Sequence, residues 1–454
     1  MIFMTTTESA ATGSGAPPAA IPGPAGSRLL GMASALRRDL LGTMLDGFHR
    51  YGDLVTYRIG PRWERLGPPA VAVHHPDGVR QVLTNPQVFG RRTAGFEVLT
   101  EMLGAGLLTS DGDLWKRQRR TLQPLFTPRR VTGYTDLMTA EAERVARHRP
   151  GAVDLHQLMQ VYTLRVVGRA LFGDEVDDVV PDLQRLVPLA SDLSLARSMQ
   201  ILRLPLDYPT PRNRRFRRVS AEMYAIVDRI LARRAGVVDG SGAGDDMLSR
   251  LRAARDPETG QPLSAQEIRD QVLVFLLAGH ETTAGALTFT LHLLGRHPEI
   301  QERVATGDPD LVRATVLEGM RLYPPAHTTE RRASVDTEIA GHRIVRGTPV
   351  LVSPWVTHRH PGCWPDPERF DPERFLGEHD RPRYAYFPFG GGPRSCIGEH
   401  FAMLEATVLL GTLLARYRVE SLDARMRLEP LITLRPAEPV RAVLHARQAA
   451  GRST

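Results

Sequence analysis

Residues 389–398 read FGGGPRSCIG, and a helical pattern follows them directly. Three glycines and a proline predict a tight loop whose backbone can approach a flat ligand closely. The cysteine of this loop, Cys396, comes just before the predicted helix, where free backbone N–H groups and the positive helix end favour a thiolate. A zinc site needs three or four ligands, and no second Cys or His lies close by. The loop therefore predicts a site with one thiolate ligand.

A haem iron takes a single axial ligand of this kind from the protein. The ten residues resemble the cysteine loop of the cytochrome P-450 family, whose pattern is Phe-x-x-Gly-x-Arg-x-Cys-x-Gly, and every fixed position matches. The resemblance implies that Cys396 ligates the iron of haem b (iron protoporphyrin IX). It also implies that Arg394 pairs with a haem propionate. The loop taken alone leaves open a structural cysteine in a glycine-rich turn.

The clearest predicted helix begins at Ser264 and ends at Pro298. Ser264 and Glu267 have the spacing of a capping box, and apolar residues then recur at helical intervals. About 33 residues at 1.5 Å each span roughly 50 Å. A helix of this length with an apolar middle is expected to cross the interior of a large domain.

The middle of this helix carries AGHETT, residues 278–283. A glutamate and two threonines are costly in a buried helix unless they are used, although a solvated kink is an alternative. The stretch resembles the family's oxygen-activation motif, an acid followed by threonine. By that resemblance Glu281 and Thr282 supply protons for the cleavage of dioxygen. We assign no catalytic role to His280.

A second helix is predicted over Pro309–Leu322, and it carries Glu318 and Arg321 on one face. On spacing alone the two form a surface ion pair of little value. The downstream stretch 370–375, FDPERF, is similar to the family's meander motif. This resemblance implies a buried structural triad of Glu318, Arg321 and Arg374 that stabilises the haem-binding core.

A basic helix is predicted to start near Trp115, and Trp115 and Arg119 share one of its faces. Both donate hydrogen bonds, which haem propionates need, although a basic surface helix is equally consistent with the spacing. The family pattern Trp-x-x-x-Arg implies that both contact propionates. Arg331 resembles another propionate partner of the family, and its neighbour Arg332 is the alternative.

The rest of the chain indicates a mainly α fold with a small β-rich lobe, and the resemblance implies the cytochrome P-450 fold, with haem between the long helix and the cysteine-bearing helix. Short strands are predicted at 54–59 and 70–73, and Ser191–Arg218 is predicted to be a mobile, apolar connection. Residues 1–27 are predicted to be a disordered leader, and 28–454 a single domain. Met4 is as plausible a start as Met1.

Composition excludes several classes of protein. The net charge is +7, but most arginines alternate with acidic residues, which argues against nucleic-acid binding. The two cysteines occur in unlike surroundings, so no disulfide framework is expected, and a reducing cytoplasm fits. The sequence predicts no membrane anchor, because its longest apolar helical run is far shorter than the ~20 residues of a span.

The resemblance implies a haem-thiolate monooxygenase that inserts one oxygen atom of dioxygen into a lipophilic small molecule, such as a terpenoid, fatty acid, steroid or polyketide. Electrons would come from a ferredoxin with its reductase, or from a flavodoxin, and the protein is expected to be a monomer. Other haem-thiolate chemistry (oxidative coupling, isomerase, peroxygenase) and a non-enzymatic haem sensor are the alternatives. The residues expected to line the substrate pocket are apolar: Phe96, Val98, Leu99, Met102, Leu195, Met199 and Ile201.

Overall fold

The structure is a computed structural model, and it describes residues 20–60, 68–173, 177–200, 203–235 and 246–447. The helices are α1 (Ala33–Arg38), α2 (Leu40–Tyr51), α3 (Pro76–Thr84), α4 (Ala94–Leu103), α5 (Gly112–Leu122), α6 (Pro128–Thr132), α7 (Thr135–Ala146), α8 (Leu155–Phe172), α9 (Val180–Ser198), α10 (Pro211–Ala235), α11 (Met247–Ala253), α12 (Ala265–Arg296), α13 (Pro298–Val304), α14 (Pro309–Leu322), α15 (Pro354–Thr357) and α16 (Glu399–Arg416). The strands are β1 (Leu54–Tyr57), β2 (Ala70–Val73), β3 (Phe89–Gly90), β4 (Gly151–Asp154), β5 (Thr329–Ala333), β6 (Thr337–Ile339), β7 (His342–Ile344), β8 (Pro349–Val352), β9 (Tyr417–Ser421), β10 (Leu428–Pro430), β11 (Leu434–Pro436) and β12 (Arg441–Ala446). Short 3-10 helices are η1 (Gln123–Phe126), η2 (Pro372–Phe375), η3 (Arg383–Ala385) and η4 (Gly392–Arg394).

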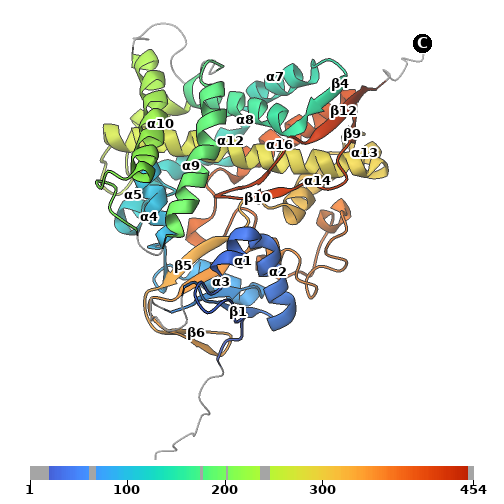
Figure 1. Cartoon of the computed structure of the whole chain (residues 1–454). Helices are drawn as coiled ribbons and strands as arrows, with labels where there is room; N and C mark the ends of the chain where they lie inside the picture. The colour runs from blue at the N-terminus through green and yellow to red at the C-terminus, as the bar shows by residue number, and fades with distance from the viewer. Residues whose placement is uncertain (1–19, 61–67, 174–176, 201–202, 236–245, 448–454) are drawn as a thin grey trace, which may run out of the picture.

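Most helices gather in one part of the molecule, and a five-stranded sheet with α1–α3 forms the other part (Figure 1). The strand order of this sheet is β1-β2-β8-β5-β3. Its one parallel pair among the described strands is β2 with β8, where Val71 lies opposite Val350. The prediction of a mainly α fold with a small β-rich lobe is confirmed.

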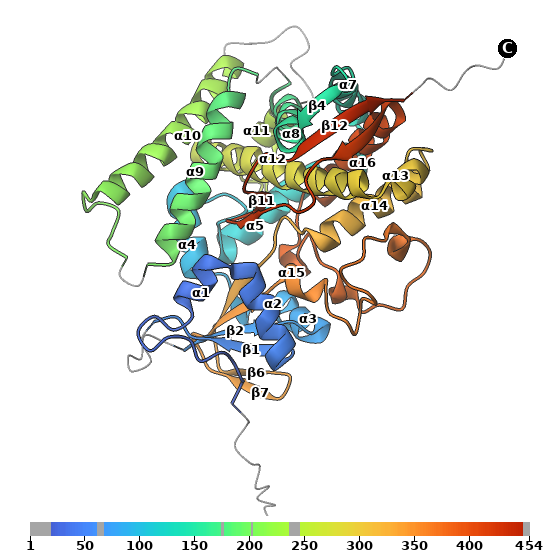
Figure 2. The same ribbon diagram turned by 45° about the vertical axis from the view of Figure 1, so that its right-hand side comes forward.

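Helix α12 runs through the centre of the helical part (Figures 1 and 2). The predicted capping box is present: the Glu267 N–H donates to Ser264 Oγ at 3.2 Å, and the Ser264 N–H donates to Glu267 Oε2 at 2.9 Å. The helix packs against α8, α14 and α16, which bury most of its side chains from Asp270 to Leu294. Among the described helices, α12 alone is long and apolar enough to cross a membrane, and 78% of its apolar window is buried inside the protein.

The prediction of a mobile connection over Ser191–Arg218 is wrong for most of that segment, because α9 continues to Ser198 and α10 already begins at Pro211. Proline is well tolerated at the first position of a helix, whose N–H has no partner there in any case. Phe216 and Val219 then turn towards the core at helical spacing. Phe216 and Val219 thus belong to a packed helix, whereas Leu204 and Tyr208, between the two helices, are exposed.

The boundary of the predicted leader also differs from the structure. Residues 1–19 lie outside the described residues. Pro22, however, lies beside β1, and its carbonyl accepts the Thr56 N–H at 2.8 Å. Ile21 packs against the apolar core of the sheet. The packed chain therefore begins several residues before position 28.

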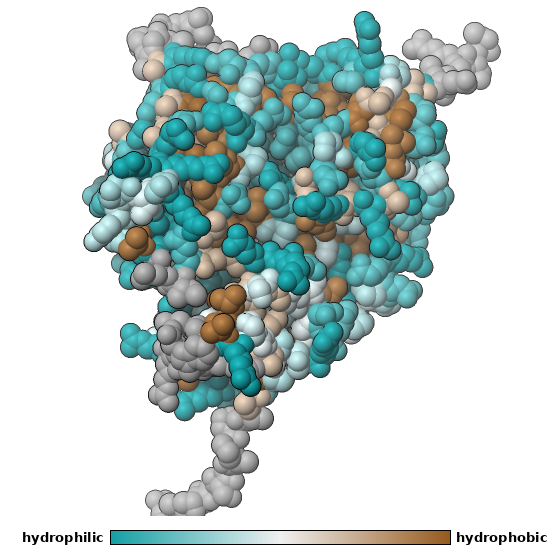
Figure 3. Space-filling view, in the orientation of Figure 1, coloured by the Kyte–Doolittle hydropathy of each residue, from teal (hydrophilic) through white to brown (hydrophobic). Residues whose placement is uncertain are grey.

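The face of the molecule seen in Figure 3 is mainly hydrophilic, with short apolar patches scattered over it. Large exposed apolar side chains such as Leu29 and Tyr208 occur at separate places along the chain. Scattered exposed apolar residues are normal on a protein surface and mark no continuous apolar band on this face.

Candidate active site

A cavity of about 370 Å³ lies between α12 and the loop that carries Cys396. One wall is α12, which contributes Ala278, Gly279 and Thr282. The opposite wall is made by the cysteine loop and the start of α16. Most of the remaining lining is apolar and comes from α8, α14 and the segments around α5: Val167, Ala170, Leu171, Val316, Met320, Leu107, Leu108 and Phe126. The cavity is therefore a mostly apolar space between two walls, and a flat molecule suits it.

Cys396 opens directly on this cavity, so its side chain is accessible although it lies inside the molecule. The Cys396 N–H donates to Phe389 O at 2.8 Å, which closes the loop. Gly392 adopts a φ of 64°, and a Cβ at this position would lie 2.2 Å from Leu83 O. The loop therefore presses its backbone against the end of α3, and only glycine fits there.

The sequence pattern predicts surroundings that favour a thiolate at Cys396, but burial of the side chain opposes that charge. Burial raises the pKa of the thiol, the nearby Gly398 N–H and Arg119 lower it, and burial prevails. The helix end and the free N–H groups thus favour a thiolate, but they do not suffice by themselves. A bound metal cation deprotonates a coordinating thiol outright. This environment suits a thiol that becomes a thiolate when it binds a metal.

A rim of arginines borders the same cavity. Arg119, Arg331 and Arg394 all line it, as does Trp115. Arg394 forms an ion pair with Asp111, and its guanidinium lies 3.9 Å from the centre of the Trp115 ring. Arg119 Nη1 donates to Ser395 O at 2.9 Å and so ties α5 to the cysteine loop. The structure brings the four sequence-predicted propionate residues together.

The choice between Arg331 and Arg332 follows from β5. Arg331 is buried and lines the cavity, whereas Arg332 is exposed. Neighbouring residues of a strand point to opposite faces of the sheet, so only one of the two can face the cavity. Burial lowers the pKa of Arg331 to about 10, which leaves its side chain charged at neutral pH.

Sequence reasoning missed a further arginine, Arg91, which also lines the cavity. Its Nη1 donates to Leu108 O at 2.8 Å, while its Nε is buried without a hydrogen-bond partner among the described residues. Burial lowers its pKa, and the positive charges of Arg331 and Arg394 lower it further. Several like charges enclosed together call for anions to pair with them.

A flat dianion with an apolar body and a metal centre fits these residues. The arginine rim offers charged donors for two carboxylates, and such charge-assisted pairs are strong. The apolar walls suit a large ring, and Cys396 offers a ligand from one wall. The unpartnered Arg91 Nε is the observation that most directly indicates a missing acceptor. The residues therefore fit haem b.

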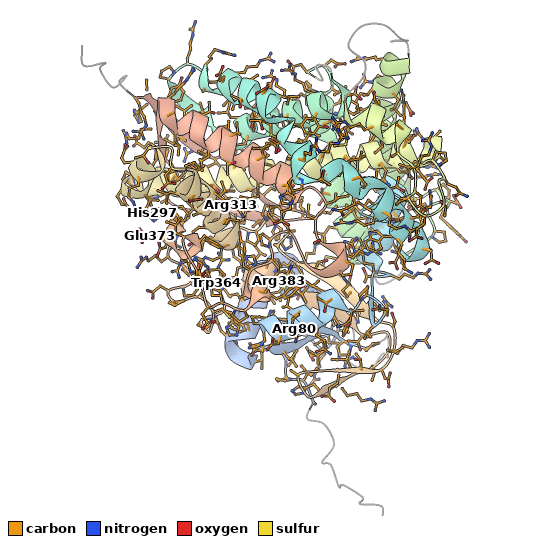
Figure 4. The ribbon with its side chains drawn as sticks, turned by 180° about the vertical axis from the view of Figure 1, so that it is seen from behind. Arg80, His297, Arg313, Trp364, Glu373 and Arg383 are labelled. Carbon is orange, nitrogen blue, oxygen red and sulfur yellow. The ribbon has the colours of Figure 1, made fainter. Side chains whose placement is uncertain are left out.

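Glu318 and Arg321 form a completely buried ion pair, with Arg321 Nε 2.6 Å from Glu318 Oε2. Arg374 Nε lies 3.6 Å from Glu318 Oε1, so the predicted triad is brought together. Arg321 also donates to backbone carbonyls of the segment that contains Trp364, whose ring lies 5.1 Å from its guanidinium and is labelled in Figure 4. Burial raises the pKa of Glu318 despite these partners. The triad joins α14 to the chain that leads into the cysteine loop.

Only one of the two residues of the oxygen-activation motif, Thr282 and Glu281, lines the cavity. Thr282 lines the cavity, and its hydroxyl donates to Ala278 O at 2.7 Å. Glu281 is 7% exposed and does not line the cavity. Burial raises the pKa of its carboxyl, while Thr433 and Arg435 beside it lower the pKa. Only the threonine therefore faces the cavity, and the acid faces the β10–β11 hairpin.

The six described residues among those predicted to line the substrate pocket do not line this cavity. Val98 and Met102 are buried in the main apolar core, and Met199 is 39% exposed. Ile201 lies outside the described residues. The prediction failed on helix α4 because Val98 and Met102 pack into the core. Apolar residues that do line the cavity include Leu107, Leu108, Val274, Phe275 and Ala326.

Comparison with known proteins identifies the family of the chain. The family described as Cytochrome P450 matches residues 21–307 and 309–442. Cyclooctat-9-en-7-ol 5-monooxygenase of Streptomyces melanosporofaciens is 36% identical, over 86% of this chain and 87% of the relative. Cyclooctatin synthase of the same organism is also 36% identical, over 92% and 94%. Pentalenene oxygenase of Streptomyces avermitilis is 34% identical, over 87% and 91%.

The protein is thus a haem-thiolate monooxygenase, with haem b as its cofactor. The chain belongs to the cytochrome P450 family.

Proposed function

We propose that this enzyme inserts one oxygen atom of dioxygen into a terpenoid, and that Cys396 is the residue that would bind the iron. The observation that carries the proposal is the thiol of Cys396, which faces Thr282 across an apolar cavity rimmed by arginines. Three relatives support the substrate class, because their names specify cyclooctat-9-en-7-ol, cyclooctatin and pentalenene. Apart from the arginines at the rim, the lining of the cavity offers such molecules no charged side chain.

The experiment is turnover with a surrogate ferredoxin, its reductase and NAD(P)H. A panel of terpene hydrocarbons and alcohols is first screened for the Soret shift that accompanies displacement of the distal water. Oxygenated product that requires both dioxygen and NAD(P)H supports the proposal. Product formed with hydrogen peroxide alone, and not with dioxygen and electrons, would indicate the peroxygenase alternative.

Each residue of the site has a distinct part in the proposed mechanism. When bound, haem would supply the redox chemistry that activates dioxygen. Its two propionates would be held by the cavity residues Arg91, Arg119, Arg331, Arg394 and Trp115. The apolar side chains exclude water, and the triad of Glu318, Arg321 and Arg374 keeps the cysteine wall in place. Glu281 and Thr282, the two motif residues on α12, would deliver protons.

Thr282 holds a proton at Oγ1, next to the cavity. Its bond to Ala278 O leaves the oxygen's lone pairs free to accept from a water molecule. Rotation of the hydroxyl away from this carbonyl would let Thr282 pass on its own proton while it takes up another from that water. Glu281 is the proposed source of protons from the other side of the helix. Burial raises the pKa of its carboxyl, which favours the protonated form that can donate.

Arg91 gives a prediction of its own. Arg91→Gln should release haem to excess apomyoglobin about tenfold faster than the parent protein, because a buried charged hydrogen bond to a propionate is lost. The matched control is Arg92→Gln, which removes the exposed neighbouring charge. Equal rates of haem release in the two variants would mean that Arg91 does not hold a propionate.

We further propose that electrons come from an acidic ferredoxin or a flavodoxin that docks on the cysteine side of the molecule. Arg80, Arg313 and Arg383 lie on the face seen in Figure 4, on α3, α14 and η3, and all three are exposed. Within the described residues, Arg313 and Arg383 form no ion pair. Tyr384 of η3 packs directly against Gly391 of the cysteine loop. A basic surface near the thiolate would attract an acidic donor.

The rate of the first electron transfer should therefore fall as salt rises, since screening acts over ~10 Å near 0.1 M ionic strength. The measurement is stopped-flow reduction under carbon monoxide, with an acidic ferredoxin. Arg313→Gln combined with Arg383→Gln should flatten the salt dependence, and Arg37→Gln on the distant α1 serves as the control. A rate that stays constant from low to high salt would refute the proposed surface.

The proposed location is the cytoplasm, and the proposed state is a monomer. The bacterial origin of the three Streptomyces relatives and the burial of α12 support this location. Sedimentation and fractionation of the expressed protein test both proposals.

A further inference from the structure

Residues 104–110 connect α4 to α5, and they contribute Leu107 and Leu108 to the cavity wall. The segment is a series of turns, without a strand ladder or a helix of its own. Its position therefore depends on the side chains that hold it. Those side chains come mainly from the first turns of α12.

Asp270 of α12 is 4% exposed, and its carboxylate accepts three hydrogen bonds. The Ala105 N–H donates to Oδ2 at 2.8 Å, and the Tyr224 hydroxyl donates to Oδ1 at 2.8 Å. Gln266 Nε2 donates to Oδ1 at 2.7 Å. In the described part of the chain this carboxylate forms no ion pair, so these donors compensate its burial. Asp270 thus joins the 104–110 segment to α12 and, through Tyr224, to α10.

Gln271 makes the next attachment, because the Leu107 N–H donates to its Oε1 at 2.9 Å. Gln118 of α5 approaches from the other side, and its Nε2 donates to Ala105 O at 2.8 Å. Gly104 allows the close approach to Asp270: its φ is 75°, and a Cβ there would lie 2.5 Å from Asp270 Cγ. Glycine thus lets the segment lie directly on α12.

The far end of the segment is held by the arginine rim. Arg91 Nη1 donates to Leu108 O at 2.8 Å, and Arg394 Nη1 donates to Ser110 O at 2.9 Å. Leu107 and Leu108 therefore lie between two anchors, one on α12 and one at the arginine rim. If either anchor is lost, the apolar wall is free to move relative to the Cys396 loop.

We propose that Asp270 and Gln271 are positioning residues, which fix Leu107 and Leu108 in the wall of the cavity and so determine how bulky ligands are held there. The inference rests on the proposed haem site. Neither residue touches the cavity, and both act through the backbone of the 104–110 segment.

Two azoles test the position of Leu107 and Leu108. Both azoles bind iron through a nitrogen atom, and only one of them is large enough to contact this apolar wall. Imidazole is the small probe, and 4-phenylimidazole carries a ring that must contact the apolar side chains. In the parent protein 4-phenylimidazole should bind more tightly than imidazole. In Asp270→Asn and in Gln271→Leu, the preference for 4-phenylimidazole should fall about tenfold, as expected for the loss of a hydrogen bond worth about 1.4 kcal/mol.

The matched control is Ser421→Ala, which removes the buried 2.8 Å contact with His292 near the other end of α12. It should lower the melting temperature and leave the azole preference unchanged. The carbon monoxide band confirms an intact haem site in every variant, and Gln271→Leu provides the test if Asp270→Asn does not fold. If the preference of these variants for 4-phenylimidazole over imidazole stays within twofold of the parent's, or rises, the inference is overturned and the proposed haem site is not affected. A parent protein that shows no Soret shift with imidazole would overturn the proposed haem site as well.

Discussion

Cys396→Ser should lose completely the Soret band that a thiolate ligand gives to the reduced carbon monoxide complex. Oxygenase activity should fall below detection in the same protein. The reason is that Cys396 offers the cavity its thiol, and a serine hydroxyl does not ionise to replace it as a ligand. The measurement is the difference spectrum of the dithionite-reduced protein with and without carbon monoxide.

Cys363→Ser is the matched control. Cys363 lies in a turn outside the cavity, and burial raises the pKa of its thiol. This variant should keep the full thiolate band and normal turnover. If Cys363→Ser lost the band while Cys396→Ser kept it, the ligand assignment would be reversed.

Thr282→Ala should uncouple electron consumption from product formation. Haem content, the carbon monoxide band and substrate affinity should stay close to those of the parent protein, because within the described part of the chain the Thr282 hydroxyl bonds only to a carbonyl of its own helix. The loss of a positioned proton donor typically costs ~10²–10⁴-fold in the step that it assists. Product per NAD(P)H should therefore drop by at least about tenfold, and hydrogen peroxide should rise to account for the missing electrons.

The control is Thr290→Ala, on the same helix. The Thr290 hydroxyl donates to the carbonyl four residues earlier at the same 2.7 Å, but it does not line the cavity. Its coupling should equal that of the parent. Unchanged coupling in Thr282→Ala would show that another group delivers the proton.

Glu281→Gln should instead slow turnover, because it removes an acid from the proposed proton supply.

The arginine rim shows where sequence analysis reaches its limit. Spacing on α5 sufficed to pair Trp115 with Arg119, because helical geometry relates positions four apart. It could not choose between Arg331 and Arg332, because strand alternation gives the two opposite faces without saying which face meets the cavity. That choice depends on the pairing of β5 with β8, where Arg331 lies opposite Val350. Such a long-range pairing is absent from any local pattern.

Other differences have the same origin. Arg91 belongs to no motif, and only the fold brings it to the cavity. The prolines of Ser191–Arg218 indicated loops, yet Pro211 begins a helix that tertiary packing completes. The pattern of α4 showed which residues are apolar, but not whether they would face the cavity or the core. By contrast, the cysteine loop and the capping box of α12 are local structures, and local sequence sufficed to predict them.

The two walls of the cavity differ in how freely they can be redesigned. The cysteine wall contains a tightly packed glycine loop, and at Gly392 a Cβ would lie 2.2 Å from a neighbouring carbonyl oxygen. Mutant libraries that include this position should yield mostly inactive, colourless clones. The facing wall is made of side chains such as Leu107, Leu108 and Phe275, whose size can change without moving the iron ligand. Directed evolution towards new substrates should therefore tolerate substitutions in this facing wall, and not in the glycine loop that carries Cys396.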